Sequence, residues 1–159
     1  MRRLRYCVAH PLTGRYVAGA NMELTKIKYS DLSSKQREIF NFQKLAAVLA
    51  DYGFNCIKLA DDWLGADFLA YHKDGEESYR IQLKGRLTID KKYSNKNLYM
   101  AFPIGKDWCV ISHDHLVELV DVHTNWLNTE SWLDKGIYHS AKPSKVLLEA
   151  ISKSIIKTT

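Results

Sequence analysis

Two stretches decide how this chain folds: residues 65–71, GADFLAY, and residues 78–84, SYRIQLK. The turn between them, residues 73–77, contains an Asp-Gly pair, which favours a tight connection between antiparallel strands. The second stretch alternates polar and apolar side chains without interruption, as a strand with one buried face does. We therefore predict a β-hairpin that carries Asp67 on its first strand.

Three polar side chains of this hairpin are predicted to converge on one face. Gln82 and Lys84 are two positions apart, so they point to the same side of their strand. Together with Asp67 they supply a carboxylate, an amide oxygen and an ammonium group, which suit a hydrolytic magnesium site. The alternatives are a turn aspartate that caps a backbone N–H, and the solvated face of an antiparallel strand.

Length and composition place the chain among ordinary globular domains. It has 159 residues, of which 46% are hydrophobic and 26% charged. No apolar stretch approaches the roughly 18 residues of a membrane span. The odd set of Cys7, Cys56 and Cys109 has no metal-ligand spacing, which favours free thiols in a reducing cytoplasmic (intracellular) compartment.

The first residues fit no secretory signal, because His10 and Pro11 interrupt the apolar stretch behind the initial arginines. We expect residues 1–24 to form an N-terminal arm or hairpin, or else an extension outside the core. Residues 25–159 are expected to form a single domain.

The order of the predicted elements is a helix, several strands and further helices. A capping box of Ser33 and Gln36 opens a helix over residues 33–52, and Gly53 ends it. Strands are predicted over residues 54–60, 66–72, 78–85, 98–104 and 108–112, with residues 86–97 as a polar loop. This order predicts an α/β sandwich with a mixed central sheet flanked by helices.

Two helices are predicted after the strands. Asp114 is expected to be the N-cap of the first, which also favours local capping over metal binding for the adjacent His113 and His115. The last helix is expected to begin near Ser144 and to continue past Ile155, with one side buried. A charged stripe is predicted on its other side, formed by Lys145, Glu149, Lys153 and Lys157.

Glu38 is the fourth polar candidate. On a helix it falls in line with Phe42, Leu45 and Leu49, which places a carboxylate on a core-facing stripe. Such a carboxylate is costly unless something pairs with it, and a metal ion or Lys84 would be that partner. The alternative is that the helix end protrudes and Glu38 is solvated near the positive end of the helix dipole.

Basic residues are concentrated directly after the hairpin. Between Lys84 and Lys96 there are five basic side chains and one acidic side chain, and an acid-rich stretch precedes them. An acidic pocket beside a basic rim fits a polyanion held against a metal site. The alternative is a solvated loop next to an acidic turn.

On these residues, the stretch 35–113 resembles the PD-(D/E)xK nuclease superfamily, which has the restriction-endonuclease-like fold. Asp67 stands at the position of the motif's aspartate, and Gln82-Leu83-Lys84 resembles its (D/E)xK part. Glu38 resembles the glutamate that many members carry on their first helix. Ala66 replaces the motif's proline, and Gln82 replaces its acidic residue, as in some homing endonucleases of this fold. Glutamine offers a neutral oxygen but no charge, so an inactive domain is also compatible with the pattern.

The resemblance implies that residues 25–159 are a nuclease-like domain, a DNA endonuclease dependent on Mg²⁺ or Mn²⁺. It would be of the homing, restriction or junction-resolving type and would act on double-stranded DNA as a homodimer or homotetramer. Asp67, Gln82, the Leu83 carbonyl and Glu38 would bind the metal, and Lys84 would orient or deprotonate a water. Phosphates would be bound by Arg86, Lys91, Lys92 and Lys96. The alternatives are an inactive DNA-binding domain on the same fold and a protein-interaction module.

Overall fold

The structure, a computed structural model, describes residues 24–158. The chain divides into two compact units, residues 1–31 and residues 32–159. In the described part of the first unit there is one short 3-10 helix, η1 (Tyr29–Asp31). The predicted N-terminal arm lies almost wholly outside the described residues, so its boundary stays a prediction.

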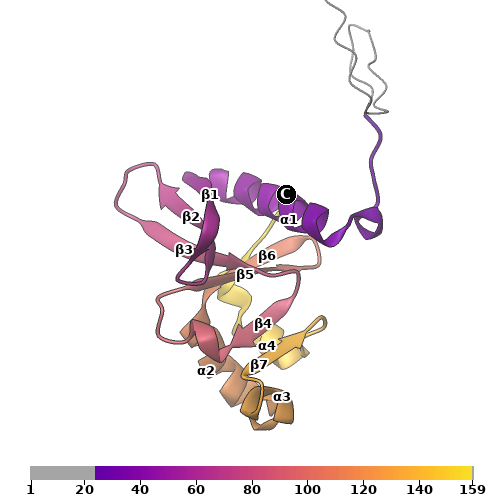
Figure 1. Cartoon of the computed structure of the whole chain (residues 1–159), viewed down its shortest axis with the longest axis vertical. Coiled ribbons are helices and arrows are strands. Elements are labelled where there is room, and N and C mark those ends of the chain that lie inside the picture. The colour runs from indigo at the N-terminus through magenta and orange to yellow at the C-terminus, as the bar shows by residue number, and fades with distance from the viewer. Residues whose placement is uncertain (1–23, 159) are drawn as a thin grey trace, which may run out of the picture. The chain divides into compact units, whose positions relative to one another are not determined.

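The second unit is built on a mixed six-stranded sheet (Figure 1). The strand order is β1–β2–β3–β5–β6–β8, and every neighbouring pair is antiparallel apart from β3 and β5, which run parallel. The predicted α/β class with a mixed central sheet is confirmed. The six strands are β1 (Phe54–Trp63), β2 (Ala66–His72), β3 (Ser78–Leu83), β5 (Tyr99–Ile104), β6 (Asp107–Ser112) and β8 (Ile155–Ile156).

A second, two-stranded sheet and several short helices complete this unit. Its strands are β4 (Leu87–Asp90) and β7 (Ile137–Ser140), which pair antiparallel. The α-helices after the first are α2 (His113–His123), α3 (Glu130–Leu133) and α4 (Lys145–Ala150), and the 3-10 helices are η2 (Lys91–Tyr93), η3 (Trp126–Asn128) and η4 (Ser152–Ser154).

Helix α1 (Ser34–Ala50) covers one face of the sheet (Figure 1) and begins after the predicted cap, but it ends at Ala50, before the predicted end at residue 52. The Ser33 hydroxyl accepts from the Gln36 backbone N–H, and the Gln36 side chain accepts from the Ser33 N–H, so the capping box is confirmed. Gly53 follows with φ at +83°, a conformation that residues with a Cβ avoid. On the sheet side, Leu45 is fully buried in one cluster with Phe68 of β2.

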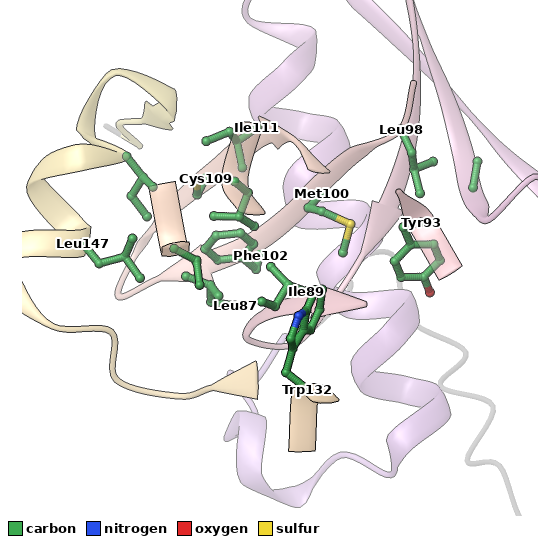
Figure 2. Packing of buried hydrophobic residues seen from close by; sticks show 14 residues of the cluster. Leu87, Ile89, Tyr93, Leu98, Met100, Phe102, Cys109, Ile111, Trp132 and Leu147 are labelled. Carbon is green, nitrogen blue, oxygen red and sulfur yellow. The ribbon is translucent and has the colours of Figure 1, made fainter. Parts of the chain in front are cut away.

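The opposite face of the sheet carries the larger core. Met100 and Phe102 of β5 point into it, whereas Ala101 between them faces α1. Figure 2 shows Met100 and Phe102 on the side of the sheet where Ile89 of β4 and Trp132 of α3 lie. The sheet is therefore buried on both faces where β5 and β6 lie.

The predicted polar loop over residues 86–97 is wrong in its first half. Leu87, Thr88 and Ile89 are buried and form β4. Tyr93, in the 3-10 helix that follows, is only 3% exposed. A four-residue strand shows too little periodicity to stand out among lysines, and its partner β7 comes much later in the chain.

The two predicted C-terminal helices need correction. Helix α2 begins at His113, with Ser112 in the N-cap position, so Asp114 is not the cap; its carboxylate accepts from the Asn95 N–H instead. Ser144 caps α4 as predicted, but this helix ends at Ala150, and Ile155 lies in β8. The predicted charged stripe through Lys153 and Lys157 therefore does not form, because the edge of β6 offers backbone partners to an extended segment.

Among residues 24–158, no helix is long and apolar enough to cross a membrane. Cys56 and Cys109 are free thiols, as expected. Burial raises the pKa of Cys56 to about 11 and that of Cys109 to about 12, which keeps both protonated. Cys7 lies outside the described residues.

Candidate active site

Asp67 sits where β2 and β3 part from one another. The last pair of the ladder between these strands joins Phe68 to Ile81, one residue after Asp67. Beyond that pair, the Asp67 carboxylate takes the place of a backbone acceptor, because its Oδ2 accepts from the Leu83 N–H at 2.8 Å. On the other side of Asp67, β1 bulges, so that its residues 59–62 oppose Asp67 alone.

Gln82 is held against the same carboxylate. Its side-chain amide N–H donates to Asp67 Oδ2, and the residue is only 6% exposed. Asp67 Oδ1 and the Gln82 amide oxygen accept no hydrogen bond from any described residue. The predicted convergence of Asp67 and Gln82 is therefore present, and each contributes one oxygen that remains available to a ligand.

The charge state of Asp67 responds to the groups around it. Partial burial raises the pKa of its carboxyl, and the Leu83 N–H and Lys84 pull the pKa downward. The negative charge of Glu38 raises this pKa, and the positive charge of Lys58 lowers it. The helix carboxylate and the two lysines are therefore close enough to Asp67 to form one electrostatic site.

Lys84 follows β3 and is anchored through its backbone, whose N–H donates to the Ala101 carbonyl at 2.8 Å. Its ammonium nitrogen lies 5.5 Å from the centre of the buried Tyr93 ring, a cation–π arrangement. No carboxylate among the described residues comes within 4.0 Å of it. Lys84 therefore carries a charge that no carboxylate neutralises, beside Asp67.

Lys84, one of the two partners predicted for Glu38, does not pair with it. Glu38 lies on the sheet side of α1, but its side chain is 42% exposed and pairs with two other lysines. Lys58 of β1 lies 2.7 Å from Oε1, and Lys35, one turn earlier on α1, lies 3.0 Å from Oε2. Hydrogen bonds from Lys58 and then Lys35 lower the pKa of Glu38. The expected pairing with Lys84 was wrong, because the register of β1 places Lys58 next to the helix end.

Leu83 contributes its backbone to the site while its side chain packs, partly buried, in the core beneath α1. This division follows from strand alternation, since Gln82 and Lys84 on either side of it face away from α1.

The four predicted phosphate-binding residues divide into two pairs. Lys91 donates to the Leu133 carbonyl at 3.1 Å, and Lys92 lies 3.6 Å from an Asp90 oxygen, so both have structural partners. The side chains of Arg86 and Lys96 are exposed, with no ion pair inside the described range. This second pair is better placed to meet a phosphate.

Sequence reasoning missed the residues that support Lys84. Tyr93 lies under two ammonium groups, since Lys92 is 4.8 Å from the centre of its ring. The segment that carries Tyr93 is tied down at both ends, because His113 Nε2 accepts from the Asp90 N–H and Asp114 accepts from the Asn95 N–H. Burial lowers the pKa of His113, which suits this acceptor role. The adjacent His113-Asp114 pair was visible in the sequence, but the backbone N–H groups of Asp90 and Asn95 that bind to it were not predictable.

The donor set suits a hard cation that keeps most of its water. No group of three or more His, Cys, Asp or Glu side chains in residues 24–158 could hold a metal ion by itself. Mg²⁺ needs fewer protein ligands than that, because it retains several waters and is often completed by substrate phosphates. The carboxylate oxygen of Asp67 and the amide oxygen of Gln82 fit such an ion.

The sequence of this chain matches no family profile, no curated protein and no solved structure.

Proposed function

We propose that the protein is a Mg²⁺- or Mn²⁺-dependent DNA endonuclease with a restriction-endonuclease-like fold. One observation carries the proposal: the end of the β2–β3 hairpin joins Asp67, Gln82 and the Leu83 backbone, with the ammonium of Lys84 beside them. The topology supports it as well, because a helix and a hairpin lead into a strand, β5, that runs parallel to β3.

In this proposal, hydrolysis adds water to the phosphorus and breaks its bond to the leaving oxygen. A bound divalent ion would stabilise negative charge on the scissile phosphate. Asp67 and Gln82 would hold that ion through the oxygens that carry no hydrogen bond. Lys84, steadied over the Tyr93 ring, would donate to the phosphate oxygens and balance the charge that develops on them.

The DNA would be a duplex or a junction, bound by a homodimer or homotetramer that presents one site to each strand. Arg86 and Lys96 would make the phosphate contacts, because no partner in the described chain occupies them. These contacts supply affinity without sequence choice.

The direct test is to incubate supercoiled plasmid with the protein and Mg²⁺, with EDTA as the control. Lys84→Ala should lower the single-turnover cleavage rate by about 10²- to 10⁴-fold and leave duplex affinity within about threefold, because it removes a charge that acts on the reacting phosphate. Lys73→Ala, an exposed lysine of the hairpin turn, is the matched control and should cut normally. Normal cutting by Lys84→Ala would disprove the assigned role.

A second candidate is a DNA-binding domain without catalysis on the same fold. It is favoured by the neutral Gln82 and by the two lysines that occupy Glu38. Replacing both Arg86 and Lys96 by Ala should reduce the salt dependence of duplex binding by about two ion equivalents, measured in EDTA, whereas Lys91→Ala should change it less. Binding without cleavage would support this candidate, and no DNA binding at all would support a protein-interaction module.

A further inference from the structure

We propose that Lys58 is a positioning residue that holds Glu38 as its counter-ion, so that Asp67 is the one carboxylate available to a divalent ion. The inference rests on the proposed function and concerns the same site. It reverses the expectation that Glu38 binds the metal. In this proposal Lys58 sets the affinity for the metal and limits the number of carboxylates that bind it to one.

The two oxygens of Glu38 are both occupied. Lys58 donates to Oε1 at 2.7 Å, and Lys35 donates to Oε2 at 3.0 Å and to Oε1 at 3.2 Å. Two ammonium groups therefore compete with any metal ion for the lone pairs of this carboxylate. Glu38 and Asp67 are therefore not equivalent: Asp67 has an oxygen without any hydrogen bond, and Glu38 does not.

Lys58 and Lys35 differ in how firmly they are placed. Lys58 belongs to β1, where it pairs in register with Phe68, and its ammonium lies 5.8 Å from the centre of the Phe42 ring. Its side chain is 35% exposed, against 71% for Lys35 at the open end of the helix. Lys58 also acts on Asp67 directly through its charge, which lowers the pKa of the Asp67 carboxyl. Lys58 is therefore the partner that matters, and Lys35 is a natural control.

The charges explain why this arrangement weakens metal binding. Three ammonium groups, those of Lys35, Lys58 and Lys84, surround the two carboxylates of Glu38 and Asp67. A divalent cation that approaches such a group meets net positive charge, which opposes its binding. Removing the Lys58 charge makes the group neutral and releases one oxygen of Glu38, whereas the charge of Lys35, whose side chain is 71% exposed, is already screened by solvent.

The test is to titrate Mn²⁺, a spectroscopically visible substitute for Mg²⁺, into the full-length protein without DNA. Lys58→Met keeps the apolar stem and should bind Mn²⁺ at least about tenfold more tightly than the wild type, because it removes a repulsive charge and frees a carboxylate. Lys35→Met should stay within about twofold of the wild type. Circular dichroism melting establishes that each variant is folded.

A double variant tests whether the gain in Mn²⁺ affinity depends on Glu38. Adding Glu38→Gln to Lys58→Met should abolish most of the gain in Mn²⁺ affinity, since the released carboxylate would no longer exist. A gain that survives in the double variant would overturn the counter-ion role. So would Mn²⁺ affinity that is equal in Lys58→Met and in the wild type.

The same titrations distinguish failure of the proposed metal site from failure of the proposed role of Lys58. If neither the wild type nor Lys58→Met binds Mn²⁺, both the metal site and the role of Lys58 are disproved. If the wild type binds Mn²⁺ and cuts DNA while Lys58→Met behaves identically, only the role of Lys58 is disproved.

Discussion

Two aspartates, each at the start of a strand of the large sheet, show how differently the same side chain can be used. Asp107, at the start of β6, accepts from the Lys157 ammonium and from the backbone N–H of Thr158, both at 3.0 Å. Asp67, at the start of β2, has a backbone N–H and an amide but no ammonium within 4.0 Å. The hydrogen bond from Thr158, followed by that from Lys157, lowers the pKa of Asp107, whereas burial raises the pKa of Asp67.

The opposite pKa shifts mean that the charge of Asp107 stabilises the folded state, whereas the charge of Asp67 destabilises it. A lowered pKa means that folding favours the charged carboxylate, and a raised pKa means that folding opposes it. Carboxylates that a fold keeps at a cost are frequently functional. Asp107 is thus expected to stabilise the position of the residues after β8, and Asp67 is expected to bind a ligand.

The largest expected effect that tests this comparison is the loss of cleavage in Asp67→Asn. Removing the carboxylate of this site that pairs with no ammonium group should lower the Mg²⁺-dependent cleavage rate by about 10³-fold or more, because the ion loses its charged ligand. The rate is measured on plasmid under single-turnover conditions. Asp121→Asn, an exposed change on α2, is the matched control. Cleavage by Asp67→Asn at the wild-type rate would remove this residue from the site.

The next largest effect concerns thermal stability, for which we expect Asp107→Asn to have a larger effect than Asp67→Asn. Asp107→Asn should lower the melting temperature by several degrees, because it removes a charge-assisted bond to Lys157 and weakens the grip on Thr158. Cleavage below the melting transition should be unchanged. Asp67→Asn should leave the melting temperature equal or slightly higher, a gain under about 1 kcal/mol because solvent screens the partly exposed carboxylate. The comparison fails if Asp67→Asn is the less stable of the two variants.

The smallest effect is the pH dependence of the difference in unfolding free energy between each Asn variant and the wild type. The raised pKa of Asp67 means that its cost to stability is fully present above that pKa and disappears as the pH falls to the unfolded value of about 4. The lowered pKa of Asp107 means that its contribution is fully present above about pH 4 and is lost as the pH falls through the lower, folded value. Urea unfolding of both Asn variants and the wild type, compared at neutral and acidic pH, should show both differences shrinking in acid. A difference that grows in acid would contradict the assigned pKa directions.

Much of the site was predictable because it depends on local patterns. The alternation around Gln82 and the Asp-Gly turn determine the hairpin, and the hairpin brings Gln82 to Asp67. The capping box at Ser33 likewise determines where α1 begins. In each case the groups that matter are near one another in sequence.

What could not be predicted depends on contacts between distant segments. Lys58 pairs with Glu38 only because α1 lies across β1 in one particular register, which no local pattern specifies. The four-residue β4 becomes a strand because β7 is there to pair with it. Ile155 follows a helical stretch and would suit its buried side, but the open edge of β6 captures it as a strand.

The bulge in β1 has a consequence for behaviour at high concentration. Among the strands of residues 24–158, β1 and β8 are the outer ones of the large sheet. The irregular stretch at residues 59–62 interrupts the regular pairing of the first edge strand, and the second edge strand is only two residues long. We therefore expect both edges to be poor templates for strands of further chains, because a bulge interrupts one and the other is short.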